Sequence, residues 1–446
     1  MSSVAKLWHK FTGLLSAHSG NTVARSASPH PAGPLETQTE AQPKITADQA
    51  HDPSLERPPD QAVAEESEDI LDERGRQPVP GVTLFHTFKG HASAVRCVAF
   101  DPEGLTLASG SSDSTIKIWD LNSGQLLNTL EGHFQNSVFS VAFDFEGRTL
   151  VSGTNKGFID QRETSRGEVV RALERRCHGT VFSVAFDSQG RWLVGATDHG
   201  VIELWDATSG KLLRFLEGHE LSVYCLAFDP EGRRLASGGN DKTIKLWDVG
   251  RNRLLRTING HTGTVRSVVF DPTGHTLASG STDTTIKLWD VKSGEMLRSL
   301  NGHTSRVEAL AYSCDGTLLA SKCRAGTIRI WNCETWKTVA IIPEPTFSKW
   351  WIPALAFHPS LPLLATAGSE PDAPEALRSR RVHLWELDVD LLLGDDLPVP
   401  IIDDVHAKTR QADDTGVAGP EEKPRDQRQA DALKELNVGT EILDLG

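Results

Sequence analysis

The sequence predicts an all-β fold built from seven repeated units, each of four short antiparallel strands. The first observation is a recurring pattern. The stretch GHASAVRCVAFDPEGLTLASGSSDSTIKIWD begins at residue 90, and close relatives of it begin at residues 218 and 260. The second observation is that each copy divides into β-branched and aromatic runs bounded by Gly, Pro and Asp turns, which is typical of short strands. No helical period of apolar residues competes with this pattern inside the repeats.

An aromatic residue closes the first apolar run of every unit and sets the repeat length. It recurs every 42 to 45 residues, at Phe100, Phe143, Phe186, Phe228, Phe270, Tyr312 and Phe357. In five units a Trp follows after 19 positions, at Trp119, Trp205, Trp247, Trp289 and Trp331. Arg162 takes this place in the second unit, and an insertion of nine residues delays the seventh Trp to Trp385. Seven units therefore lie between about residues 81 and 387.

The fifth unit illustrates how one repeat divides into strands. TVRSVVF is a first strand, and DPTG is a turn in which Pro fixes one φ angle and Gly permits a positive one. HTLASGS, TIKLWDV and EMLRSL are then the second, third and fourth strands. The seventh unit lacks a fourth strand after Trp385, because Asp and Pro residues interrupt the chain there. Residues 82–88 resemble the fourth strands of other units, and we expect them to complete the seventh and hide its edge.

His261, Ser279 and Asp283 are the residue types of a hydrolase triad, which raises the possibility of an enzyme. The same residue types recur in register elsewhere, however, together with a Trp. The other two complete sets are His91, Ser109, Asp113 and Trp119, and His219, Ser237, Asp241 and Trp247. A triad is needed once, whereas each unit of a repeat array must carry its own folding instructions. A structural role is therefore predicted.

The period near 42, the Gly-His opening and the Trp-Asp ending resemble the WD-repeat family of β-propellers over residues 81–387. The resemblance implies an all-β, seven-bladed β-propeller of four-stranded antiparallel blades around a central channel. It also implies that the His, Ser, Asp and Trp of a unit form a hydrogen-bonded tetrad. The second unit has Lys156 and Arg162 in place of the Asp and Trp, so we predict that it is the least stable blade.

The net charge of −14 resides in the terminal regions. Residues 1–80 carry 7 basic and 12 acidic side chains, residues 388–446 carry 6 and 15, and the repeats hold 33 of each sign. A neutral ring predicts no nucleic-acid binding, which requires a basic surface. The absence of an apolar run of about 20 residues predicts no membrane span. Both terminal regions have few aromatic residues, and we expect residues 1–80 and 388–446 to be mostly disordered.

Residues 3–16 differ from the rest of the N-terminal region. Their apolar residues share one face at helical spacing, namely Val4, Leu7, Trp8, Phe11, Leu14 and Leu15. An organelle transit peptide, a partner-docking helix, a helix lying on a surface and an unstructured end all remain open.

The six cysteines form no CxxC pair, which predicts no metal site and a reducing, cytoplasmic location. No phosphate-binding loop, dinucleotide fingerprint, HExxH or GxSxG motif occurs, so no cofactor and no catalytic activity are expected. The best-supported function is a non-catalytic scaffold that binds partner proteins or peptides. A sensor or regulatory module of an NTPase or protease assembly is a second reading. An enzyme with its site at the mouth of the channel is a third.

Candidate partner-binding residues lie four positions before each aromatic. The preceding position is uniformly Val or Ile, as expected of a core, whereas this one varies in chemistry. The series is Arg96, Phe139, Phe182, Tyr224, Arg266, Glu308 and Pro353. The resemblance implies that this position faces the upper rim of the channel, where aromatic and Arg side chains often dominate binding. Packing of the rings between blades is the alternative.

The seventh unit supplies a second set of candidates. Trp350 and Trp351 precede its first strand, where other units have Gly-His, and its insertion carries Arg378, Arg380 and Arg381. In the topology of the family both loops emerge on one face, so we expect these residues to form a second contact point for a partner. Packing of the two tryptophans under the loop is the alternative.

Overall fold

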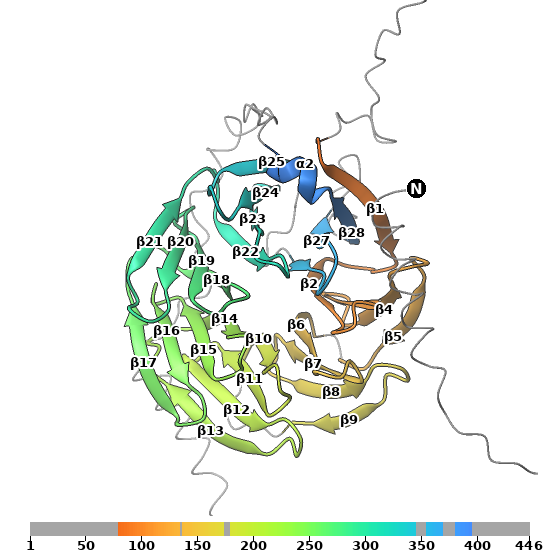
Figure 1. The fold of residues 1–446 in the computed structure, drawn as a ribbon. Helices are drawn as coiled ribbons and strands as arrows, with labels where there is room; N and C mark the ends of the chain where they lie inside the picture. Colours follow the sequence, from red (N-terminus) through yellow and green to blue (C-terminus); the bar gives the residue numbers. More distant parts are fainter. Residues whose placement is uncertain (1–78, 134–135, 174–178, 345–353, 369–379, 395–446) are drawn as a thin grey trace, which may run out of the picture. The chain divides into compact units, whose positions relative to one another are not determined.

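The computed structural model describes residues 79–133, 136–173, 179–344, 354–368 and 380–394. Residues 79–394 form seven four-stranded antiparallel sheets arranged around a central axis (Figure 1). The predicted seven-bladed propeller is confirmed. Residues 1–78 and 395–446, with the amphipathic stretch 3–16, lie outside the described residues.

Blades 1 to 6 each contain four consecutive strands, and blade 7 contains β26, β27, β28 and β1. The innermost strands are β2 (Val95–Phe100), β6 (Val138–Phe143), β10 (Val181–Phe186), β14 (Val223–Phe228), β18 (Val265–Phe270), β22 (Val307–Tyr312) and β26 (Leu355–Phe357). The second strands are β3 (Thr106–Ser111), β7 (Thr149–Thr154), β11 (Trp192–Thr197), β15 (Arg234–Gly239), β19 (Thr276–Ser281), β23 (Leu318–Cys323) and β27 (Leu363–Gly368). The third strands are β4 (Ile116–Asp120), β8 (Ile159–Glu163), β12 (Val201–Asp206), β16 (Ile244–Asp248), β20 (Ile286–Asp290), β24 (Thr327–Asn332) and β28 (Arg381–Leu387). The outermost strands are β5 (Leu126–Leu130), β9 (Val169–Ala172), β13 (Leu212–Glu217), β17 (Arg253–Ile258), β21 (Met296–Leu300), β25 (Thr338–Pro343) and β1 (Val82–Lys89).

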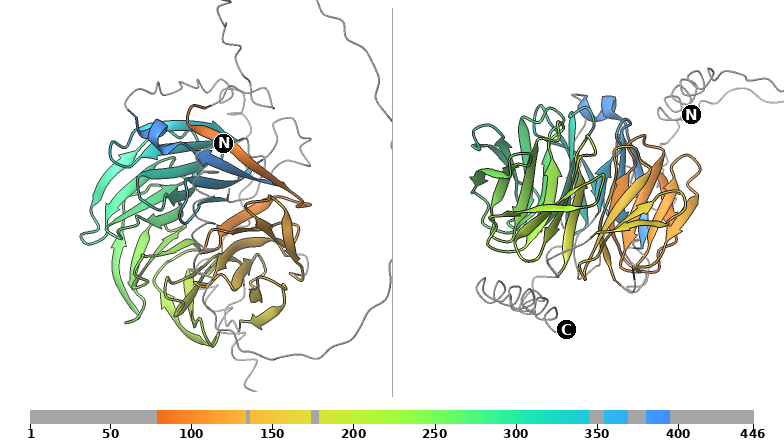
Figure 2. Two further views of the ribbon diagram at one scale, coloured as in Figure 1. Left: turned by 45° about the vertical axis from the view of Figure 1, so that its right-hand side comes forward. Right: turned by 90° about the horizontal axis from the view of Figure 1, so that it is seen from below.

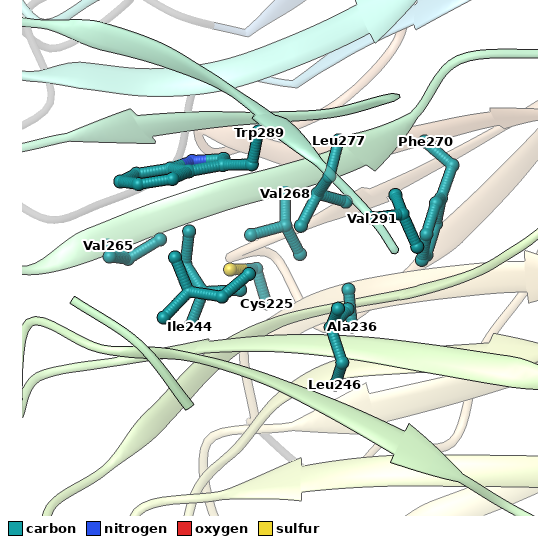
Figure 3. Close-up of a cluster of buried hydrophobic side chains, with 11 residues drawn as sticks. Cys225, Ala236, Ile244, Leu246, Val265, Val268, Phe270, Leu277, Trp289 and Val291 are labelled. Atoms are coloured by element: carbon teal, nitrogen blue, oxygen red, sulfur yellow. The ribbon is translucent and has the colours of Figure 1, made fainter. Parts of the chain in front are cut away.

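The hydrophobic core lies between neighbouring blades. Figure 3 shows the cluster between blades 4 and 5, where Ile244 and Leu246 of β16 face Val265 and Val268 of β18. The blades approach closely because the second strand carries a glycine. A Cβ atom added to Gly238 would lie 2.5 Å from Cγ1 of Val265. Val265 is fully buried, as expected for the uniform Val position. Burial of such branched side chains contributes about 1.5–3 kcal/mol each.

The ring is closed by the two ends of the described chain. β1 pairs antiparallel with β28, with Val82 opposite Leu387 and Lys89 opposite Arg381. Figure 2 shows the orange β1 beside the blue β28. The N-terminal strand thus completes blade 7, in the position that the sequence indicated.

A short helix, α2 (Val389–Leu393), follows β28 and was not expected from the sequence. The Asp388 side chain caps its first turn by accepting from the Leu391 N–H, and Leu392 is buried. The Asp388 N–H donates to the carbonyl of Gly81 at 2.9 Å. The first seven residues of the region predicted to be disordered, residues 388–394, are therefore ordered against the start of β1.

Candidate partner-binding rim and the buried polar groups

Among the residues that the structure describes, three blades contain complete His–Ser–Asp–Trp tetrads. In blade 5, His261 Nδ1 lies 2.8 Å from Asp283 Oδ2, and His261 Nε2 lies 2.8 Å from Ser279 Oγ. The Trp289 indole N–H donates to the same Ser279 oxygen at 2.7 Å. Blades 1 and 4 repeat this geometry, with the corresponding distances all 2.8 Å. The tetrad implied by the resemblance is therefore present.

The tetrad serine cannot act as a nucleophile although its distances resemble those of a catalytic triad. Ser279 is completely buried, and its Oγ lies between the His261 ring and the Trp289 indole, so no substrate can reach it. Burial alone would raise the pKa of Asp283, but hydrogen bonds from Thr285 and His261 outweigh burial and lower this pKa to about 2. The carboxylate is therefore an ionised structural group, and the tetrad ties the start of the first strand to the second and third strands.

Two blades contain incomplete tetrads. His133 of blade 2 contacts Ser152 at 2.9 Å, and His303 of blade 6 contacts Ser321 at 2.7 Å. Lys156 and Ala325 stand where the other blades have Asp. The Nδ1 atoms of both histidines are buried without a hydrogen-bond partner. Burial, followed by a nearby Arg, lowers the pKa of His133 to about 4 and that of His303 to about 3, so both rings are neutral near pH 7.

Blade 7 replaces the tetrad with a buried charged network that sequence reasoning missed. The Glu344 carboxylate accepts hydrogen bonds from the Lys322 ammonium, from Thr366 at 2.6 Å and from His383 at 2.6 Å. The Trp385 indole N–H donates to the Thr366 hydroxyl at 3.0 Å. Burial opposes ionisation of Glu344, but the charge of Lys322 and the bond from His383 hold its pKa well below the usual range.

A signal for this network was present in the sequence. Lys322 occupies the second-strand position that is Gly280 in blade 5 and Gly238 in blade 4. A lysine at a position reserved for close approach of the next blade must reach a buried acidic partner, since an isolated buried charge is very costly. The network joins blade 6 to blade 7 through charge, whereas blades 4 and 5 meet through apolar side chains.

Most of the predicted rim residues form a continuous series of contacts across neighbouring blades. The Phe139 and Phe182 rings stack with centroids 6.2 Å apart, and the Phe182 and Tyr224 centroids lie 4.7 Å apart. The Arg266 guanidinium carbon lies 4.2 Å from the Tyr224 ring centroid. Arg266 Nε then donates to Glu308 Oε2 at 2.9 Å. We call these five residues the rim ladder.

The two ends of the rim ladder differ in burial. Tyr224, Arg266 and Glu308 are buried, whereas Phe139 and Phe182 are only half-buried. The Tyr224 ring is therefore enclosed by its neighbours, whereas the phenylalanines retain accessible area, and partner binding at this position stays a prediction.

Arg96, the first residue of the predicted series, is buried. Its Nε donates to Ser112 Oγ at 2.6 Å, and burial lowers its pKa to about 10, where it stays charged at neutral pH. Pro353 lies outside the described residues.

The second set of candidates is only partly described. Trp350, Trp351 and Arg378 lie outside the described residues. Arg380 immediately precedes β28, and Arg381 begins this strand opposite Lys89 of β1, with both arginine side chains half-buried.

The described residues include no group of three or more His, Cys, Asp and Glu side chains arranged to hold a metal ion. Five cysteines are described, and all are free thiols. In the described part of the chain, no helix is long and apolar enough to cross a membrane.

Comparison with known proteins identifies matches over short parts of the chain. Nuclear distribution protein nudF of Aspergillus niger is 58% identical over 50 residues, which cover 11% of each chain. Nuclear distribution protein PAC1-1 of Uncinocarpus reesii is 43% identical over 76 residues, 16% of this chain and 17% of that protein. The chain thus spans only about a tenth to a sixth of the length of these relatives.

The family match is more extensive. The model of the WD domain, G-beta repeat, matches residues 82–120, 124–159, 167–206, 210–248, 252–290 and 294–332, just over half of the chain. Propellers of this kind typically serve as protein-interaction scaffolds and are usually non-catalytic. Together with the seven blades and the three tetrads, these matches show that the chain belongs to the WD domain, G-beta repeat family.

Proposed function

We propose that this protein is a non-catalytic scaffold that binds partner proteins or peptides at the rim ladder. The observation that carries the proposal is the graded burial of the ladder. Tyr224 and Arg266 are held between their neighbours by ring and charge contacts, while Phe139 and Phe182 keep accessible ring area on adjacent blades. Aromatic side chains that are already fixed lose little conformational entropy when a partner binds.

The partner chemistry that fits this surface is an apolar or aromatic side chain. The Arg266 charge is already compensated by Glu308, so the buried end of the ladder does not demand an additional acidic partner. The stacked phenylalanines offer apolar area and ring faces, which favour an aromatic, aliphatic or cationic side chain. A cytoplasmic location is part of this proposal, and the five free thiols among the described residues are consistent with a reducing compartment.

The test compares partners recovered with the full-length chain and with the variant Phe139→Ser/Phe182→Ser. We expect specific partners to be lost while the melting temperature falls by only a few degrees. Phe145→Ser is the control, because Phe145 is an aromatic residue with accessible area, 51% exposed, but follows the opposite end of the first strand. Equal recovery by all variants would contradict the proposal, as would loss of partners in the Phe145 variant alone.

The tryptophans of blade 7 form a second, separate proposal for the same function. Trp350→Ala and Trp351→Ala, tested singly, should reduce partner recovery at an unchanged melting temperature if these residues contact a partner with Arg378, Arg380 and Arg381. A large drop in melting temperature with no separable binding effect would contradict this second contact point.

A further inference from the structure

Blade 5 shows which groups surround the carboxylate of a complete tetrad. Asp283 Oδ2 lies 2.8 Å from His261 Nδ1 and accepts a hydrogen bond from the Thr262 N–H at 3.0 Å. The other oxygen, Oδ1, accepts from the hydroxyl of Thr285 at 2.7 Å and from the N–H of the same residue at 3.0 Å. Both oxygens of this carboxylate are therefore bound by groups that the rest of the blade supplies.

Blade 6, formed by β22 to β25 (Figure 1), keeps these donors but has no carboxylate at the same position. The donors correspond by position to those of blade 5 and belong to His303, Thr304 and Thr327. Ala325 takes the place of Asp283. The exchange of Asp for Ala thus removes the two acceptor oxygens and leaves the residues that would bind them.

The turn that carries Ala325 has the same backbone conformation as the corresponding turn of blade 5. The Gly326 N–H closes it with a hydrogen bond of 3.1 Å, as the Thr284 N–H does in blade 5 at 3.2 Å. These two residues have φ angles of 83° and 71°. A side chain at position 325 therefore leaves the backbone in the direction that Asp283 takes toward its histidine.

The His303 ring is held as it would be in a complete tetrad. Its Nε2 atom lies 2.7 Å from Ser321 Oγ, and the Trp331 indole N–H donates to the same oxygen at 2.8 Å. His303 is only 8% exposed, and its Nδ1 atom is buried without a hydrogen-bond partner. Leaving a buried polar atom unpaired costs free energy, which a carboxylate at this position would recover.

Two arginines adjoin the same turn, at positions where blade 5 has threonines. They are the exposed Arg324 and the half-buried Arg306, and the Arg324 N–H donates to the Arg306 carbonyl at 3.0 Å. In the described part of the chain Arg306 forms no ion pair. Glu308, two positions further along, already binds Arg266. Positive charge therefore lies next to the position that lacks its acid, which favours an anionic group there.

No other blade combines these features among the residues that the structure describes. Blades 1, 4 and 5 carry the tetrad Asp, and blade 7 has the carboxylate of Glu344. Blade 2 has Lys156 in place of the Asp and Arg162 in place of the Trp. Blade 3 has Gly195 where the tetrad Ser is expected. Blade 6 alone keeps the His, Ser and Trp while lacking the acid.

We propose that blade 6 binds the carboxylate of an aspartate or glutamate from a partner protein, which completes its tetrad. One oxygen accepts from His303 Nδ1 and from the Thr304 N–H, and the other accepts from the Thr327 hydroxyl. The ring then carries its proton on Nδ1, and the Ser321 hydroxyl donates to Nε2. The site rests on the proposed scaffold function, because a partner supplies the acid, but it uses none of the rim-ladder residues.

The first test supplies the carboxylate from the chain itself. Ala325→Asp in the full-length protein should raise the melting temperature by at least about 2 °C, because it gives the buried nitrogen of His303 a partner. In a His303→Gln background the same substitution should give at most about half of this gain, since attraction to Arg306 persists but the hydrogen bond does not. Ala325→Asn is the uncharged control of the same shape and should stabilise less than Ala325→Asp.

The second test supplies the carboxylate from outside. The probe is the peptide acetyl-Gly-Glu-Gly-amide, and its Gln counterpart is the uncharged control. The ring nitrogen resonances of His303, assigned by their loss in His303→Gln, should shift at millimolar concentrations of the Glu peptide and not with the Gln peptide. The resonances of His261 should stay in place, because Asp283 already occupies that tetrad. The shift should vanish in Ala325→Asp and weaken several-fold in Arg306→Gln.

Four results would overturn the proposal. Ala325→Asp without stabilisation would mean that the donors do not converge or that an acid of this chain already binds them. Equal stabilisation by this substitution in both backgrounds would exclude His303 as the partner. A missing response of His303 to the Glu peptide would exclude an external carboxylate. A larger response to inorganic phosphate would contradict the choice of a carboxylate.

The rim ladder provides the control that separates this site from the proposed binding surface. Phe139→Ser/Phe182→Ser should leave the response of His303 to the Glu peptide unchanged. Loss of partners in that variant tests the rim ladder, whereas loss of the peptide response in Ala325→Asp tests blade 6. Failure of one proposal is therefore distinguishable from failure of the other.

Discussion

The Nε2 atom of His358 in blade 7 lies 2.8 Å from the carbonyl oxygen of Gly104 in blade 1, although the two residues are 254 positions apart in the chain. The Nδ1 atom accepts from the backbone N–H groups of Ser360 and Leu361 at 3.1 and 3.0 Å, so the proton resides on Nε2, which donates to Gly104. This bond joins blade 7 to blade 1, in addition to the β1–β28 pairing within blade 7. A Cβ atom on Gly104 would lie 2.2 Å from the imidazole, so only glycine fits.

His358→Ala should lower the free energy of unfolding by about 1–3 kcal/mol, because it leaves the Gly104 carbonyl and two N–H groups without their partner. Urea unfolding of the full-length chain measures the loss. His275→Ala is the control, since His275 is exposed and should change stability by less than about 0.5 kcal/mol. Equal effects of the two substitutions on the free energy of unfolding would contradict a role of His358 in closing the ring.

The buried network of blade 7 predicts an asymmetric response to mutation. Lys322→Met leaves the Glu344 carboxylate buried without its main countercharge and should cost about 3–5 kcal/mol. Adding Glu344→Gln removes the stranded charge, and the double variant should regain most of that loss. The measurement compares the unfolding midpoints of the single and double variants, and Lys211→Met is the control because Lys211 is exposed. A double variant no more stable than Lys322→Met would contradict an ion pair as the source.

His303 predicts a loss of stability in mild acid. Its pKa is about 3 in the folded protein and about 6.5 in an unfolded chain. Between these values the unfolded chain binds a proton that the folded one does not, so the free energy of unfolding falls as pH drops, by about 1.4 kcal/mol per pH unit. Asp241 and Asp283, with pKa values of about 2, contribute a loss only below about pH 4.

The measurement is the free energy of unfolding at pH 7, 6 and 5. The variant His303→Gln keeps a polar contact toward Ser321 but cannot take up the proton. It should therefore be less stable at pH 7 and show a shallower slope toward pH 5. A slope identical to that of the unmodified chain would rule out His303 as a source of the acid sensitivity.

Blade 2 should open first in hydrogen exchange. Arg162 fills the place of the tetrad Trp and donates to the carbonyl of Glu131 at 2.8 Å, but its Nε atom and His133 Nδ1 are buried without partners. Amides of β8 should therefore exchange faster than those of β16 and β20, which belong to blades with complete tetrads. The variant Lys156→Asp/Arg162→Trp restores the missing groups and should slow exchange in β8. Equal protection in the three strands would leave blade 2 no weaker than the others.

The repeats made most of the fold predictable because each blade specifies itself. The 19-residue step from Phe270 to Trp289 places two buried side chains on the first and third strands of one blade, and this local rule recurs around the ring. Closure of the ring by the N-terminal strand could also be predicted from the sequence, because the residues before Lys89 match the fourth strands of other units. The α2 helix escaped prediction, since a five-residue stretch of leucines beside aspartates has no repeat to be compared with.

For the network of blade 7, Lys322 at a glycine position signalled a buried ion pair, but no repeat pattern identified its partner. Glu344 lies in IIPEP, where no Gly-His marks the opening, and its meaning depends on Lys322 and His383 from different strands. The sequence identified the residues of the rim ladder, because the residue type at this position varies from one unit to the next. The contact between Arg266 and Glu308 requires the spacing of neighbouring blades, which the sequence does not state. The contacts of Trp350 and Trp351 remain a prediction.

The pairing of β1 with β28 also dictates an order of events during synthesis. β1, the first of the described strands, must wait until the chain has reached Leu387 before it can pair with β28. Blades 1 to 6 can assemble from local hairpins in the meantime, leaving the unpaired edges of an open ring exposed. Such sequence-distant pairing slows folding and lengthens the period in which those edges can join other chains. The nascent protein thus has its greatest need of chaperones just before its last blade is complete.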